Sequence, residues 1–106
     1  SLTPLMAEVR EKLGDGPVYL SFAIDGIDPA FAPGTGTAEI GGLTSTQGIE
    51  IIRGMRGLDV VGGDLVEVSP PYDPFGNTSV LAANLLFEML CILPGVRYDD
   101  KVKAIY

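Results

Sequence analysis

Two short apolar segments, at residues 18–22 and 58–68, constrain the fold of this chain most strongly. Helical patterns over residues 3–13, 44–57 and 79–93 surround them, so the expected order is helix, strand, helix, strand, helix. Strands that alternate with helices favour a parallel sheet covered on both faces. Two strands do not make a stable parallel sheet alone. The sequence therefore predicts an α/β fold of which this chain is an incomplete part.

The helix boundaries follow from residues that cap or stop a helix. We predict that the first helix is capped by Thr3, the second by Thr44 or Ser45, and the third by Asn77 or Thr78. The second helix is expected to stop at Gly57 and the third to run to Leu93. In the third helix, which is apolar on nearly every face, Asn84 and Glu88 are expected to mark the least buried stripe.

The composition indicates one globular domain at most and disfavours some classes of binding partner. Of the 106 residues, 46% are apolar and 20% are charged, and the net charge is −7. This acidity argues against nucleic acid or an anionic membrane as partner and is compatible with cationic amines and guanidines. The longest apolar stretch, at residues 80–93, is too short to span a bilayer. Residues 1–10 lack the order of a signal peptide, so we expect a cytoplasmic or mitochondrial protein that is not secreted.

The absence of histidine restricts the chemistry of this chain. It excludes a Ser-His or Cys-His catalytic pair within these residues, and the single cysteine excludes an intrachain disulfide. A metal ion would find only oxygen ligands here. Such ligands suit magnesium, calcium or manganese better than zinc.

Acidic side chains follow both predicted strands. Asp25 and Asp28 lie in a glycine- and proline-rich loop at residues 24–43, and a second acidic segment, residues 64–73, contains Glu67 at the end of the second strand and Asp73 beyond it. A loop of this length is more often functional than idle, and ligands of α/β sheets bind beyond the carboxyl ends of the strands. Carboxylates at such a place are neutralised either by a bound cation or by hydrogen bonds to loop amides, and the pattern alone leaves both open.

Two motifs resemble those of one enzyme family. Residues 21–37, SFAIDGIDPAFAPGTGT, resemble the ureohydrolase signature S-F-D-[IV]-D-x-[LI]-D-P-x-x-x-P-x-[TS]-G-T, and residues 67–73, EVSPPYD, resemble a segment of its agmatinase branch. The likeness covers about residues 3–95. The chain is thus identified with the ureohydrolase (arginase/agmatinase) family, in the agmatinase or guanidinobutyrase branch. We expect residues 1–106 to be the carboxy-terminal portion of a single ureohydrolase domain, with a flexible tail over residues 97–106.

The resemblance implies a three-layer α/β/α arginase-like fold, two manganese ions and a role for each matching residue. Asp25 matches a metal ligand. Glu67 matches the glutamate that holds the substrate guanidinium, with which a carboxylate can form two parallel hydrogen bonds. Thr37 matches the substrate-binding threonine, and Asp28 matches a structural aspartate. Ala23 stands where the family has the aspartate that bridges both metals.

The resemblance also implies hydrolysis of a linear guanidino compound, such as agmatine or 4-guanidinobutyrate, to urea and an amine, in a homo-oligomer. Ala23 offers no ligand, and the upstream ligands of the family are absent. We therefore predict that this chain binds manganese weakly or not at all and is impaired as an enzyme. It is a fragment, a degenerate relative or a deliberately inactivated variant. Two alternatives are a non-catalytic relative acting by subunit association, and a binding module for cations that rests on Glu67 and net charge.

Two residues of the second motif have an open role. Tyr72 and Asp73 either line the substrate pocket or anchor the loop that carries them. The sequence favours neither.

Overall fold

The computed structural model describes residues 1–97. Its helices and strands follow the predicted order, and two short 3₁₀ helices lie directly after the first strand and close after the second. The elements are α1 (Thr3–Leu13), β1 (Pro17–Ala23), η1 (Ile24–Gly26), α2 (Ser45–Arg53), β2 (Asp59–Val66), η2 (Pro70–Tyr72) and α3 (Asn77–Cys91). Residues 98–106 lie outside the described part, and so does the flexible tail expected there, apart from Arg97.

The two strands form a parallel sheet, which confirms the predicted α/β class. The register runs from Pro17 beside Asp59 to Ala23 beside Val66, with one irregularity after Val18. Parallel strands end at the same edge of a sheet. The loops that follow β1 and β2 therefore start side by side.

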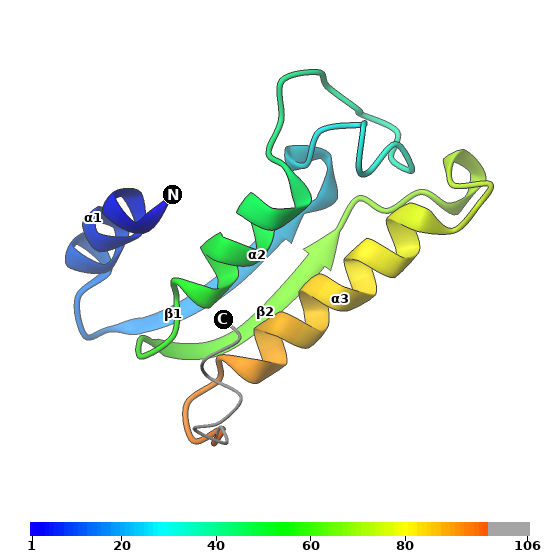
Figure 1. Ribbon diagram of the computed structural model, residues 1–106. Coiled ribbons are helices and arrows are strands. Elements are labelled where there is room, and N and C mark those ends of the chain that lie inside the picture. The colour runs from blue at the N-terminus through cyan, green and yellow to red at the C-terminus, as the bar shows by residue number, and fades with distance from the viewer. Residues whose placement is uncertain (98–106) are drawn as a thin grey trace.

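Helices α2 and α3 cover one face of this sheet, and α1 lies on the far side of α2 from α3 (Figure 1). The alternate residues of β1 that face the helices, Val18 and Phe22, are buried, and Ile52 of α2 and Leu85 of α3 are fully buried against them. Burying such a side chain contributes roughly 1.5–3 kcal/mol relative to leaving it exposed. This shared core fixes both loop origins relative to the helices.

The opposite face of the sheet is open in the part of the chain that the structure describes. Tyr19 of β1 is 61% exposed, and Val66 of β2 is 40% exposed. Parallel sheets normally have both faces covered. The open face agrees with the prediction of an incomplete α/β unit.

Several predicted helix boundaries were wrong for local physical reasons. Thr3 is the first helical residue rather than the cap, because Leu2 holds the cap position without a side-chain bond. The second helix ends at Arg53 instead of reaching Gly57, and the backbone oxygen of Gly54 there accepts a hydrogen bond from Arg10. Thr44 is the true cap, in a reciprocal capping box with Gln47.

The third helix also differs from the prediction. It starts at Asn77 and ends at Cys91, short of Leu93, and its cap residue is Gly76 in the left-handed conformation. Glu88, expected on the least buried stripe, is 8% exposed and forms a two-bond ion pair with Arg53 of α2. Sequence periodicity could not reveal this pairing because it depends on how α2 packs across α3.

Among the residues that the structure describes, no helix has both the length and the apolar character to cross a membrane.

Candidate functional site

The candidate residues after β1 form one hydrogen-bonded unit. Ala23 ends the strand, and the chain turns at once into η1, which carries Asp25. The Thr37 hydroxyl donates to the Asp25 carboxylate at 2.7 Å across twelve residues of loop. Thr37 is exposed and Asp25 is half-buried. The structure thus brings these two predicted site residues together, on the side of the loop open to solvent.

Asp28 anchors the same loop from within. Its carboxylate accepts hydrogen bonds from the backbone N–H of Ala30 at 2.9 Å and of Gly41 at 3.0 Å. The Ala30 amide, followed by the Gly41 amide, lowers the pKa of Asp28 below its ordinary value. Backbone bonds of Asp28 and Gly26 with Leu43 close the two ends of the loop. The loop amides therefore stabilise the ionised carboxylate of Asp28, which fits the structural role expected of it.

Glu67 follows β2 directly and has an unusual backbone. Its φ of +75° is the one positive value at a non-glycine residue in the described part of the chain. Holding a residue with a Cβ in this region costs on the order of 1–3 kcal/mol, so the surrounding structure must enforce it. The Glu67 side chain is exposed and forms no hydrogen bond or ion pair within residues 1–97. Among the described residues, no side chain or backbone group therefore competes for its carboxylate.

The strand register places these residues at one edge. Ala23 pairs with Val66, so Glu67 begins its loop beside the strand end that leads to Asp25. Glu67 shares the edge with Asp25 and Thr37 but makes no direct bond to either.

Asp73 anchors its loop rather than offering a free carboxylate. It is 9% exposed and accepts bonds from the backbone N–H of Thr78 and Ser79 and from the Ser79 hydroxyl, at 3.0, 2.9 and 2.7 Å. These bonds, led by that of the Ser79 hydroxyl, lower the pKa of Asp73. Tyr72 beside it is 60% exposed. The open choice for Asp73 between pocket and anchor is therefore decided in favour of the anchor.

Metal binding at this strand edge depends on how many donor side chains meet there. No group of three or more acidic, histidine or cysteine side chains within residues 1–97 is arranged to hold a metal ion. Asp25 is the one carboxylate at the predicted metal position, and the methyl group of Ala23 cannot ligate. These residues alone do not fit a two-metal centre.

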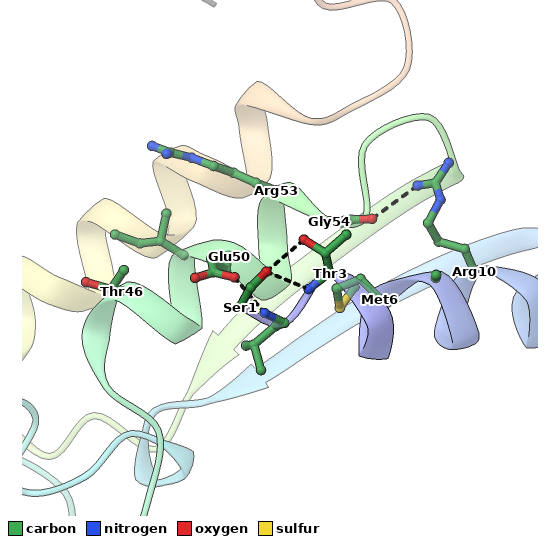
Figure 2. A pocket seen from close by; sticks show the side chains of 11 residues that line it. Ser1, Thr3, Met6, Arg10, Thr46, Glu50, Arg53 and Gly54 are labelled. Carbon is green, nitrogen blue, oxygen red and sulfur yellow. Dashed lines mark hydrogen bonds between the residues drawn. The ribbon is translucent and has the colours of Figure 1, made fainter. Parts of the chain in front are cut away.

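A hollow of about 870 Å³ lies elsewhere, between α1 and α2 (Figure 2). Met6 and Arg10 line it from α1, and Glu50 and Arg53 line it from α2. The Leu2 backbone N–H donates to Glu50 at 3.0 Å, which ties the start of α1 to α2. None of the residues lining this hollow belongs to the two loops, so it is separate from the candidate site.

Sequence reasoning missed one group beside the site. Asp64 of β2 accepts hydrogen bonds from the Ser21 and Tyr19 hydroxyls of β1, each at 2.7 Å. The Ser21 bond, then the Tyr19 bond, lowers the pKa of Asp64. The polar residues are evident in the sequence, but only the register, which sets Ser21 opposite Asp64, shows that their side chains are in contact. The trio ties the two strands together two residues before they end.

Known proteins match this chain along most of its length. The model of the Arginase family matches residues 1–91. The guanidinobutyrase of Pseudomonas aeruginosa is 78% identical over 96 residues, which are 91% of this chain and 30% of that protein. The mitochondrial agmatinase of Gallus gallus is 70% identical over 97 residues, 92% of this chain and 28% of that protein.

Solved structures match in the same way. The proclavaminate amidino hydrolase from Streptomyces clavuligerus has a TM-score of 0.82 and 47% identity, covering 85% of this chain and 31% of that one. The arginase from Bacillus caldovelox has a TM-score of 0.76 and 32% identity, covering 84% and 31%. The chain spans about 30% of the length of the proteins it matches.

Proposed function

Because the chain belongs to the arginase family, with strands and helices that form one part of the arginase-like α/β/α fold, we propose that it is the guanidinium-binding portion of a ureohydrolase domain. The observation that carries this proposal is the shared strand edge. It sets the exposed carboxylate of Glu67, which has no hydrogen-bond or ion-pair partner among residues 1–97, beside the loop in which Thr37 and Asp25 are bonded. A carboxylate there can accept two parallel N–H bonds from a planar guanidinium ion.

The proposed substrate is a linear guanidino compound such as 4-guanidinobutyrate or agmatine. Support comes from the relatives, which include a guanidinobutyrase and an agmatinase. The proposed location is the cytoplasm or the mitochondrion, and the second is supported by the mitochondrial agmatinase. A homo-oligomer and a position at the carboxy-terminal end of the domain belong to the same proposal.

The rest of the domain has to complete the site. Thr35, in the loop beside Thr37, has a hydroxyl that is buried without a hydrogen-bond partner among the described residues. Leaving such a group unpaired costs about 1–3 kcal/mol, so a partner from outside these residues is expected. The manganese centre of the proposed enzyme likewise needs ligands that residues 1–97 do not contain.

Alanine at position 23 is proposed to impair this enzyme. Changing residues that merely support metal ligands typically costs 10–100-fold in metal affinity or activity. Losing a ligand outright should cost at least as much. A second candidate, a relative that keeps the fold but acts through subunit association, is favoured by this same alanine.

A chimera tests the proposal. This chain would replace the matching 96-residue segment of the Pseudomonas guanidinobutyrase. Urea release from 4-guanidinobutyrate and from agmatine would be measured, together with Mn²⁺ titration by calorimetry. We expect Ala23→Asp to restore two metal sites and to raise urea release at least 10–100-fold over the parent chimera.

The matched control is Ala83→Asp, which adds the same charge at an exposed position of α3. It should leave urea release as low as in the parent. Two tight manganese sites and full turnover with Ala23 in place would overturn the proposed impairment. A folded Ala23→Asp chimera that releases no urea from any guanidino compound would overturn the proposed function.

A further inference from the structure

A fully buried hydroxyl joins the two loops of the candidate site. Thr78, the second residue of α3, is 0% exposed, and its hydroxyl oxygen accepts a hydrogen bond from the Gly34 backbone N–H at 2.9 Å. The two residues are 44 positions apart. Gly34 lies three residues before Thr37, so this bond acts on the loop that carries the proposed substrate-binding threonine. The proposed function gives Thr78 no role.

Thr78 is itself held in place by Asp73. The carboxylate of Asp73 accepts the N–H groups of Thr78 and Ser79 and the Ser79 hydroxyl, so it caps α3 where the N-cap residue, Gly76, has no side chain. Charge-assisted bonds of this kind are short and strong. The position of the Thr78 hydroxyl is therefore set by the end of the loop that begins at Glu67.

The backbone oxygen of Gly34 is bound as well. It accepts the N–H of Ser69 at 2.8 Å. The backbone N–H and the backbone oxygen of Gly34 are thus both bonded to residues that follow β2: the N–H to Thr78 and the oxygen to Ser69. Ser69 is two residues after Glu67, so this bond also constrains the strained backbone of Glu67 from its carboxyl side.

The close approach requires glycine at position 34. A Cβ atom there would lie 2.6 Å from the Cβ of Asp73 and 2.8 Å from the Cβ of Thr78, closer than real Cβ atoms come. Gly34 is itself buried. The contact is therefore packed as well as hydrogen-bonded, and it leaves the loop little freedom to slide.

We propose that Thr78 is a positioning residue which, through Gly34, sets the spacing between Thr37 and Glu67 and thereby the geometry of the guanidinium site. This inference rests on the proposed function, because the spacing matters for activity only if those two residues bind the substrate. Thr78 touches no substrate. A misplacement of about 1 Å remote from the reacting atoms can cost roughly 100-fold in rate.

The test compares Thr78→Val with Thr78→Ser in the Ala23→Asp chimera. Valine keeps the shape and removes the acceptor, whereas serine keeps the hydroxyl. We expect Thr78→Val to lower kcat/KM at least about 10-fold, mainly through kcat. Thr78→Ser should stay within about threefold of its parent. The matched control is Thr46→Val, at the second position of α2, where the side chain is exposed and its loss should change kcat/KM less than twofold.

Amide hydrogen exchange supplies a readout that needs no hydrolysis. In the same proteins, Thr78→Val should speed exchange at Gly34 and Ser69 at least about 10-fold while the amides within α2 keep their parental rates. Thr78→Ser should not. If the Ala23→Asp chimera proves inactive, the proposed function fails, but these exchange rates still decide whether Thr78 positions the loop. Unchanged exchange, unchanged kinetics, or equal damage from serine and valine would overturn the inference.

Discussion

The two loops that begin at the shared strand edge are held in opposite ways. The loop after β1 spans residues 24–43 and carries Ile40 at 91% exposure; its ends are held by Asp28 and loop amides, and Gly34 is held by Ser69 and Thr78. The segment after β2 turns within ten residues and is fixed by Asp73 to α3. The strained Glu67 lies in the short, over-determined segment, and the exposed Thr37 lies in the long one. The strained backbone of Glu67 therefore lies where neighbouring structure can enforce it.

The largest effect on kcat/KM is expected from removing the charge of Glu67, in the short segment after β2. In the Ala23→Asp chimera, Glu67→Gln should lower kcat/KM for 4-guanidinobutyrate about 10–100-fold, because charge-assisted bonds contribute about 1.5–3 kcal/mol. Glu39→Gln, at an exposed position of the long loop, is the control and should change kcat/KM less than twofold. Steady-state kinetics measure both. Equal effects of the two substitutions would remove the distinction between the loops.

The next largest effect is a loss of stability at Gly34, where the two loops are in contact. Gly34→Ala should lower the free energy of unfolding by about 1–3 kcal/mol, because its Cβ would overlap with Asp73 and Thr78. Gly36→Ala is the control, since a Cβ there meets nothing within 4 Å and its φ is not positive. Urea unfolding of the chimera measures both. If the two substitutions cost the same, the long loop is not clamped at Gly34.

A smaller effect of opposite sign is expected at the strained residue. Glu67→Gly should raise the free energy of unfolding by about 1 kcal/mol, because glycine adopts a φ of +75° without a Cβ penalty. The same substitution removes the carboxylate, so it should also weaken substrate binding and raise KM. Urea midpoints and KM values would be compared with those of Glu67→Gln, which keeps the strain. A loss of stability with glycine would show that the strained backbone is not enforced as described.

The smallest effect concerns acid. The pKa of Asp73 is lowered chiefly by the Ser79 hydroxyl, so the stabilisation it provides is complete above the ordinary carboxyl pKa. This stabilisation is lost as the pH falls through the lowered folded-state value. Asp28, whose pKa is lowered by the Ala30 and Gly41 amides, follows the same sign. Asp73→Asn and Asp28→Asn should each flatten the decline in unfolding midpoint between about pH 5 and pH 2. A decline equally steep in both variants would exclude these carboxylates as its source.

Sequence reasoning predicted the element order, the parallel pairing and the placing of Asp25 after the first strand, because periodicity and motif are local properties. It extended the second strand to residue 68, whereas β2 ends at Val66 and Glu67 follows it. It failed at Glu88 and at the start of α3, where the outcome depends on Arg53 and Asp73 arriving from other elements. The Ser21–Asp64 pair and the Thr78–Gly34 bond were equally out of reach, since residues 43 and 44 positions apart meet only through register and packing. The roles of Ala23, Thr37 and Glu67 remain predictions.

The central claim is that the two loops form one guanidinium site with Glu67 as its anchor. A crystal structure of the Ala23→Asp chimera with 4-guanidinobutyrate bound tests it most directly. The claim predicts the guanidinium plane against the Glu67 carboxylate, with two N···O distances of about 2.7–2.9 Å, and Thr37 beside the ligand. A guanidinium group bound away from Glu67 would contradict it.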